Sequence, residues 1–303
     1  MPASPFADAE RDTDGVVRGQ VVLDGLVKLL DVQPTGDDTF VGYSPPASGR
    51  ARVFGGQVAS QALVAASRTV PAERSVHSLH AYFLRPGDPN TPITYSVDRL
   101  RDGGSFTTRR VLAEQRGQTI FAMSASFQVD EPGLDHQLPM PDVPDPESLP
   151  TLAERIAGVD DELVGWRRGP RAFDLRYVSE PPWQARLSGP KPQEPFQVWF
   201  KADGTLPDDP VLHVCLVAYL SDITLLDGVL IEHGVAPGVD DLQMASLDHA
   251  MWFHRPIRAD EWLLYDVSSP SASSARALGL GHFFSQPGQL LVTVVQEGLV
   301  RLL

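Results

Sequence analysis

An internal duplication limits the folds that this chain can adopt. Five residues of the first half recur in the second half, each 170 positions later and without a gap. They are Phe83, Arg85, Pro86, Tyr95 and Val97, which recur as Phe253, Arg255, Pro256, Tyr265 and Val267. Chance gives about one identity in a window of that size, so five indicate duplication. With only two copies, we expect two similar domains and not a solenoid.

Each copy has the same order of predicted elements, an apolar helix followed by several strands. The helix of the first copy begins near Phe54 and ends before Pro71, because the residue before a proline disfavours the helical region. The helix of the second copy is predicted at 223–232 and ends at Gly234. Alternating apolar residues predict the strands 76–84, 93–100, 106–115, 119–129, 243–254, 262–267, 275–284 and 290–302. The class is therefore α+β, with antiparallel strands after a buried helix.

Composition divides the chain into a lead-in, two domains and a linker. Residues 1–20 are predicted to be a loose lead-in, and a short helix is predicted at 21–32. The domains are predicted at 21–130 and 173–303. The linker, 131–172, is rich in Pro and Asp, and a short helix is predicted within it at 152–166.

Charge and cysteine content limit the class of function. The chain of 303 residues has a formal net charge of −14, which disfavours nucleic acid and anionic membrane surfaces as partners. Its single cysteine, Cys215, lies in an apolar run and is predicted to be a buried structural thiol. No signal peptide and no apolar stretch of about 18 residues is recognised. These features predict a cytoplasmic protein without a membrane span.

One carboxylate stands out, because ionised carboxylates are rarely buried without a partner. Asp222 interrupts the apolar run 216–226. It either caps a helix that starts there or is held in a cleft for chemistry. Aligning the two copies by their helix starts places Gly56 at the position of Asp222. A helix of this kind can thus begin without Asp, which favours the chemical role.

Several longer segments carry a family resemblance. They include the glycine pair in Phe54-Gly55-Gly56-Gln57 and the Ser221-Asp222 pair. The others are the segments 77–88, 98–106, 247–256, 271–276 and 295–298. In this order they resemble the acyl-CoA thioesterase II (TesB) family, from about residue 25 to the C-terminus.

The resemblance implies a double hotdog fold, in which each antiparallel sheet wraps around a long central helix. It implies hydrolysis of fatty acyl-CoA without a cofactor or a metal, by Asp222, Ser246 and Gln296 around a water molecule. The family's Thr is replaced by Ser246, and the aromatic residue often found after the Asp is absent. Hotdog domains often pair through their sheets, so a homo-oligomer is expected. Aligning the final strands places Ala125 near the Gln296 position. The first half therefore has no carboxylate base, and we expect one complete site per chain, in the second half.

These residue types suit thioester hydrolysis. The leaving thiolate has a solution pKa near 8.5, so it departs with little acid assistance. Asp222 would act as general base, Ser246 and Gln296 would hold the water, and helix-start N–H groups near Asp222 would receive the oxyanion. Each residue also has a structural interpretation: Asp222 as a helix cap, Ser246 as an ordinary strand serine, and Gln296 as a buried hydrogen-bonded amide.

Other functions and sites were weighed against this hypothesis. One rival is a non-catalytic acyl-CoA binding or sensing protein. Another is a hotdog enoyl-CoA hydratase, whose Asp is closely followed by a His on the central helix, whereas here His233 is distant. Neighbouring strand residues face apart, which disfavours a dyad of Asp248 and His249 and a metal pair of His77 and His80. The candidates for holding the CoA phosphates are Arg52, Arg85, Arg255 and Arg258.

Overall fold

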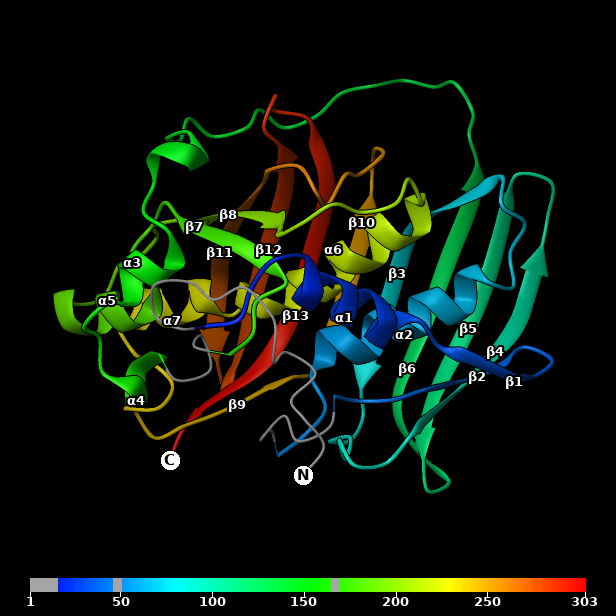
Figure 1. Cartoon of the computed structure of the whole chain (residues 1–303), viewed down its shortest axis with the longest axis horizontal. Helices are drawn as coiled ribbons and strands as arrows, with labels where there is room; N and C mark the ends of the chain where they lie inside the picture. Colours follow the sequence, from blue (N-terminus) through cyan, green and yellow to red (C-terminus); the bar gives the residue numbers. More distant parts are fainter. Residues whose placement is uncertain (1–15, 46–50, 165–168) are drawn as a thin grey trace.

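The structure is a computed structural model that describes residues 16–45, 51–164 and 169–303 (Figure 1). The helices are α1 Gln20–Leu30, α2 Gly55–Ser67, α3 Leu152–Ile156, α4 Asp161–Val164, α5 Pro182–Ser188, α6 Pro210–Thr224 and α7 Asp227–His233. The strands of the first half are β1 Gln33–Gly36, β2 Thr39–Gly42, β3 Arg74–Phe83, β4 Ile93–Asp102, β5 Phe106–Gln115 and β6 Gln118–Val129. Those of the second half are β7 Phe173–Tyr177, β8 Phe196–Ala202, β9 Leu242–Ser246, β10 Asp248–Phe253, β11 Leu263–Ser273, β12 Arg276–Ser285 and β13 Leu290–Leu302.

The strands of both halves form one continuous antiparallel sheet. Its order is β1-β2-β4-β5-β6-β3-β10-β13-β12-β11-β8-β7, with β9 added beside β13. The halves join where β3 pairs with β10, from Tyr82 opposite Asp248 to Ser78 opposite Trp252. This join places the two central helices next to each other and covers an edge of each half-sheet.

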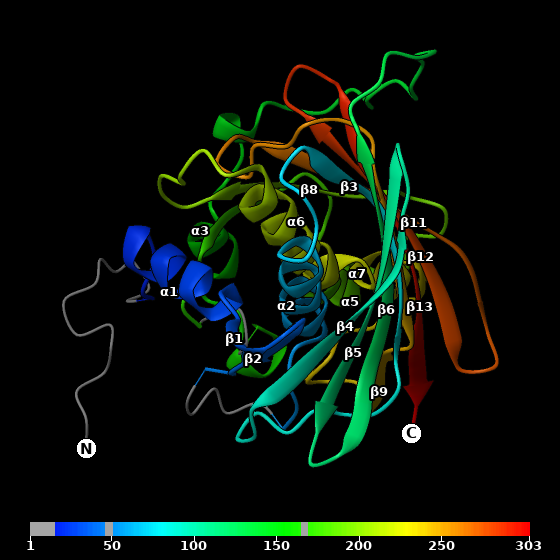
Figure 2. The same ribbon diagram turned by 90° about the vertical axis from the view of Figure 1, so that its right-hand side faces the viewer.

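The helices cover one face of this sheet (Figure 2). In the first half α2 packs on β4, β5 and β6, and in the second half α7 packs on β8, β11 and β12. Helix α6 packs along α2 at the centre of the molecule. Each half therefore has the predicted hotdog architecture, and the α+β double hotdog predicted from the sequence is confirmed.

Helix α2 is buried on nearly all sides, as its Ala-rich sequence predicts. Its polar side chains find internal partners, as buried polar groups must. Ser60 Oγ donates to Cys215 O of α6 at 2.8 Å. Tyr95 Oη donates to Gln61 Oε1 at 2.7 Å, and Gln61 Nε2 donates to Leu29 O at 2.6 Å. These bonds fix α2 against α6, the sheet and α1.

The second-half helix begins earlier than the sequence predicts. Asp209 is the N-cap of α6 and accepts from the N–H of Val211 at 3.0 Å, and Pro210 takes the first helical position. The predicted helix 223–232 corresponds to the end of α6 and to α7, which closes at Gly234 with φ 62°. Asp222 therefore lies in the last turn of α6 and not at a helix start. The start was missed because α6 is apolar all round and has no amphipathic stripe.

The segment Pro210–His233, which comprises α6 and α7, corrects a second expectation. Within the described ranges it is the one run whose length, 24 residues, and apolar composition would suffice to cross a membrane. The expectation that no stretch reaches this length was therefore wrong. However, 72% of its most apolar window is buried inside the protein, as expected for the core helix of a hotdog domain.

The linker helix is shorter than predicted. Instead of a helix at 152–166, the chain forms α3 and α4, separated at Gly158, whose φ is +72°. Helix α3 begins with a capping box of Thr151 and Glu154. Residues 165 and 166 of the predicted helix lie outside the described residues, as do residues 1–15 of the predicted lead-in. Strand β1 was not predicted, because its four residues are all exposed and show no apolar alternation.

The close approach of α2 and α6 gives a stability prediction. A Cβ on Gly56 would lie 2.5 Å from Tyr219 O, a backbone atom that cannot rotate away. We expect Gly56→Ala to lower the free energy of unfolding by about 1–3 kcal/mol, measured by urea denaturation. Gly104→Ala is the matched control, since a Cβ there meets nothing within 4 Å. Equal stability of the two variants would contradict this packing argument.

Candidate active site

The three residues predicted from the sequence meet at the carboxylate of Asp222. Ser246 Oγ and Gln296 Nε2 each donate to Asp222 Oδ1, both at 3.1 Å. Gln296 Nε2 also donates to Ser246 Oγ at 2.7 Å. The three side chains come from α6, β9 and β13, so segments far apart in sequence build one cluster.

Strand pairing explains why Ser246 and Gln296 lie together. Ser246 of β9 is paired with Gly298 of β13. Gln296 lies two residues before Gly298, and residues two apart in a strand share a face. Diagonal neighbours of this kind lie within reach of a long side chain such as Gln.

The start of α2 provides the third hydrogen bond to Asp222. The N–H of Gly56 donates to Asp222 Oδ2 at 2.8 Å. Phe54, the N-cap of α2, makes no side-chain capping bond, so the carboxylate of Asp222 performs that role from another helix. A Cβ on Gly55 would lie 2.7 Å from Asp222 Oδ2, which explains the need for glycine there. Asp222 does cap a helix, but the helix is α2 and not its own.

Burial and hydrogen bonding oppose each other at Asp222. Burial raises its pKa above the ordinary value, because the charged form loses solvation. The hydrogen bonds from Gln296, Ser246 and Gly56 favour the charged form and limit the rise of the pKa. The positive end of the α2 dipole also favours a negative charge at this position. The balance is an Asp whose pKa lies above the ordinary range, which suits a general base.

Sequence reasoning missed a fourth polar residue, His249. Its Nδ1 lies 2.6 Å from Gln296 Oε1, and its Nε2 lies 2.8 Å from Ser221 Oγ. Burial lowers the pKa of His249, so the neutral ring is favoured. Asp248 faces a different partner, accepting from the N–H of Glu297 at 2.6 Å. The sequence analysis considered His249 only as a partner of Asp248, so it did not reveal the contact of His249 with Gln296.

Asp222 and Ser246 open into a mostly apolar cleft of about 690 Å³. The size and apolar lining fall in the range of small-molecule sites. Its apolar walls come from both halves of the chain. They include Val53, Phe54, Val58, Phe83, Leu84, Ile120, Phe121, Ile223, Leu226, Met244 and Leu247.

The four candidate arginines divide into two groups. Arg52 and Arg85 line the cleft and donate to the backbone carbonyls of Met244 and Thr119. Neither forms an ion pair with a carboxylate of the described residues. Arg255 and Arg258 are absent from the cleft lining and are ion-paired with Asp135 and with Asp208 and Asp260, respectively.

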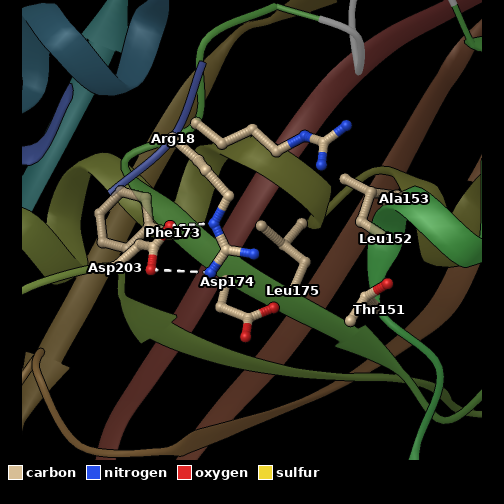
Figure 3. Close-up of a pocket in the computed structure, with 9 residues that line it drawn as sticks. Arg18, Thr151, Leu152, Ala153, Phe173, Asp174, Leu175 and Asp203 are labelled. Atoms are coloured by element: carbon tan, nitrogen blue, oxygen red, sulfur yellow. Dashed lines mark hydrogen bonds and ion pairs between the residues drawn. The ribbon is translucent and has the colours of Figure 1, made fainter. Parts of the chain in front are cut away.

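A second, smaller hollow does not suit a substrate (Figure 3). Its volume is about 20 Å³, room for about one water molecule. Three of its charged lining residues are ion-paired, since Arg18 pairs with Asp203 at 2.9 Å and Asp174 pairs with Arg176 at 2.9 Å. The large cleft is therefore the better candidate site.

Two other types of site are not supported. Cys215 is buried, and burial raises the pKa of its thiol, which leaves it unreactive as a nucleophile. Among the residues that the structure describes, no group of three or more His, Cys, Asp or Glu is placed to hold a metal ion.

Comparisons with known proteins agree with this geometry. Residues 171–299 match the family model for acyl-CoA thioesterase, and residues 43–128 match that for the acyl-CoA thioesterase N-terminal domain. Human acyl-coenzyme A thioesterase 8 is 41% identical, covering 91% of this chain and 88% of its own. Acyl-CoA thioesterase 2 of Haemophilus influenzae is 38% identical, and the match covers 92% of this chain and 98% of that protein.

A solved structure gives the same result. Acyl-CoA thioesterase II TesB2 from Mycobacterium marinum is 44% identical and superimposes with a TM-score of 0.75, covering 92% of this chain and 98% of that chain. The duplicated sheet, the shared cleft and this likeness over nearly the whole length lead to one conclusion. The chain belongs to the acyl-CoA thioesterase II (TesB) family.

Proposed function

We propose that this chain hydrolyses fatty acyl-CoA to a free fatty acid and CoA, with a water molecule activated by Asp222. The observation that carries the proposal is the convergence of Asp222, Ser246 and Gln296 at an apolar cleft. Membership of the TesB family supports the substrate class. The apolar walls provide a place for the acyl chain beside the carboxylate.

Counting acceptor positions indicates which carboxylate oxygen takes the proton. Asp222 Oδ1 already accepts from Ser246 and Gln296, which occupies both of its lone pairs. Asp222 Oδ2 accepts from Gly56 alone among the described residues. One lone pair of Oδ2 is therefore available to a water molecule, which Asp222 would deprotonate as it attacks the thioester carbonyl.

The start of α2 would stabilise the developing oxyanion. N–H groups in the first turn of a helix have no acceptor within that helix. Gly55 lies in this turn and lines the cleft, so its N–H would be offered to a substrate there, while the N–H of Gly56 already donates to Asp222. Developing negative charge at this position is favoured by aligned backbone dipoles. The thiolate of CoA then leaves with little acid assistance.

Arg52 and Arg85 would bind the phosphates of CoA at the entrance to the cleft. The chain is strongly acidic, so an anionic substrate needs local cations. The duplication provides an internal comparison. Arg85 and Arg255 occupy equivalent positions, and each donates to a backbone carbonyl at 2.7 Å. Arg255 is ion-paired with Asp135 of the linker, whereas Arg85 has no carboxylate partner among the described residues and can pair with a ligand phosphate.

The two alternative functions fit less well. A hotdog hydratase needs a His close to the Asp on the central helix, but here His249 belongs to β10 and contacts Gln296. A non-catalytic binding protein would not need a carboxylate held by three donors at the cleft. A cytoplasmic location, a homo-oligomeric state and the domain boundaries at 21–130 and 173–303 stay predictions.

The first activity prediction concerns the general base. We expect Asp222→Asn to reduce kcat by about 10²–10⁴-fold with a panel of acyl-CoA substrates, because the amide cannot accept the water proton. Release of free thiol measures the rate. Asp266→Asn is a matched control, since Asp266 accepts from Gln197 and does not line the cleft. Full activity of Asp222→Asn would remove Asp222 from the mechanism.

After single turnover in ¹⁸O-labelled water, label in the Asp222 carboxyl would refute direct water attack.

The second prediction concerns pH. Because Asp222 must be ionised and burial raises its pKa, kcat/KM should increase with pH through a midpoint above the ordinary Asp value of about 3.9. Ser246→Ala removes a hydrogen bond to the ionised form, so the midpoint should move to higher pH. The pH profiles of both proteins test this. A downward shift in the variant would contradict the proposed role of Ser246.

The third prediction concerns substrate binding. We expect Arg85→Ala to raise KM for acyl-CoA about tenfold with little change in kcat, because it removes a contact to phosphate made equally in ground and transition states. Arg255→Ala is the matched control, since it removes the equivalent backbone hydrogen bond but no charge in the cleft. A short acyl thioester without phosphates should show no difference between Arg85→Ala and wild type. Equal KM effects in the two variants would contradict the assignment.

A further inference from the structure

The orientation of the Gln296 amide decides whether the site can work. As observed, Nε2 donates one hydrogen to Asp222 Oδ1 and the other to Ser246 Oγ. A half-turn of the amide would place its oxygen against the carboxylate, and two acceptors would then face each other. Gln296 is only 1% exposed, so bulk solvent is not available to hold the amide in one orientation.

His249 lies where it can fix that orientation. Its Nδ1 is 2.6 Å from Gln296 Oε1, which has no hydrogen to donate. The contact is therefore attractive only when Nδ1 carries the hydrogen. In a neutral ring, Nε2 must then be an acceptor.

Ser221 completes the chain of hydrogen bonds. Its Oγ lies 2.8 Å from His249 Nε2 and 2.9 Å from Ala218 O, but a hydroxyl has a single hydrogen. With a neutral ring protonated at Nδ1, that hydrogen must go to Nε2 and not to Ala218 O. Donation to Ala218 O instead would require the protonated ring, which burial of His249 disfavours. Ser221 and His249 are 0% and 1% exposed, so this series of hydrogen bonds is shielded from solvent.

We propose that His249, held as its Nδ1–H tautomer by Ser221, is a positioning residue that orients the Gln296 amide toward Asp222. The hydrogen bonds run in one direction, from Ser221 through His249 and Gln296 to the carboxylate. The effect on turnover rests on the proposed hydrolysis by Asp222. The tautomer of His249 can be measured without turnover, so a failure of one proposal is distinguishable from a failure of the other.

The first test reads the tautomer directly. Nitrogen-15 NMR of histidine-labelled protein at pH 7, assigned by the signal lost in His249→Asn, should show a neutral ring protonated at Nδ1. Ser221→Ala removes the donor to Nε2 with little change in volume, and it should reduce the population of that tautomer. A wild-type ring protonated at Nε2, or at both nitrogens, would overturn the proposal. An unchanged tautomer in Ser221→Ala would overturn the role of Ser221.

The second test compares two amide replacements in the acyl-CoA assay. The amide nitrogen of Asn takes a place near Nδ1, whereas that of Gln takes a place near Nε2. His249→Gln should lose about 10–100-fold in kcat with little change in KM, by analogy with the loss found when a partner that orients a metal-binding side chain is removed. His249→Asn should retain most of the activity. If His249→Gln and His249→Asn have equal folded stability and lose kcat to the same extent, the proposal is overturned.

A double-mutant cycle isolates the path of the effect. If His249 acts through Gln296, adding His249→Gln to Gln296→Ala should cause no further loss of kcat. An additive loss of kcat would show that His249 acts on the reaction by another route and would overturn the proposal that it acts through Gln296.

Discussion

The hydrogen bond between the Gly56 N–H and Asp222 Oδ2 is the contact on which the rest of the structure depends. It joins the start of α2, in the first half, to the end of α6, in the second half. It needs a close approach, because a Cβ on Gly55 or Gly56 would lie within 2.7 Å of Asp222 Oδ2 or Tyr219 O. The β3–β10 pairing brings the two helices to this distance, and Ser60 holds them there by its bond to Cys215 O. One interaction therefore couples the fold of both halves to the candidate active site.

The same contact explains how an apolar core tolerates a charged group. Burial raises the pKa of Asp222, and a half-satisfied buried network would be strongly destabilising. Three donors meet the carboxylate, and Gln296, His249 and Ser221 extend the network away from it. Each of these polar side chains finds a partner inside the protein. The network thus supports both the stability of the core and the orientation of the Asp222 carboxylate at the candidate site.

The sequence predicted the architecture well because duplication and alternation are local signals. Most of the strands, the helix α2 and the meeting of Asp222, Ser246 and Gln296 follow from those signals or from the family resemblance, whereas the exposed strand β1 does not. The start of α6 did not follow, because a helix apolar on every face has no 3.6-residue stripe. The capping of α2 by Asp222 did not follow either, since it joins residues 166 positions apart. His249 was rejected as a partner of Asp248, and its contact with Gln296 appears only when β10 and β13 are paired.

Packing also explains why two similar halves carry one candidate site. The sequence comparison aligns Gly56 with Asp222 by their expected helix starts, and the structure instead places Asp222 in the last turn of α6, but the two residues do touch each other. A side chain at residue 56 would collide with Tyr219 O, so only one of the two positions can carry one. An acid at both would in addition place two carboxylates side by side, and one would be forced to stay protonated. A residue without a side chain at position 56 is therefore a condition for the ionised Asp222, and the N–H of Gly56 serves as a donor to its carboxylate.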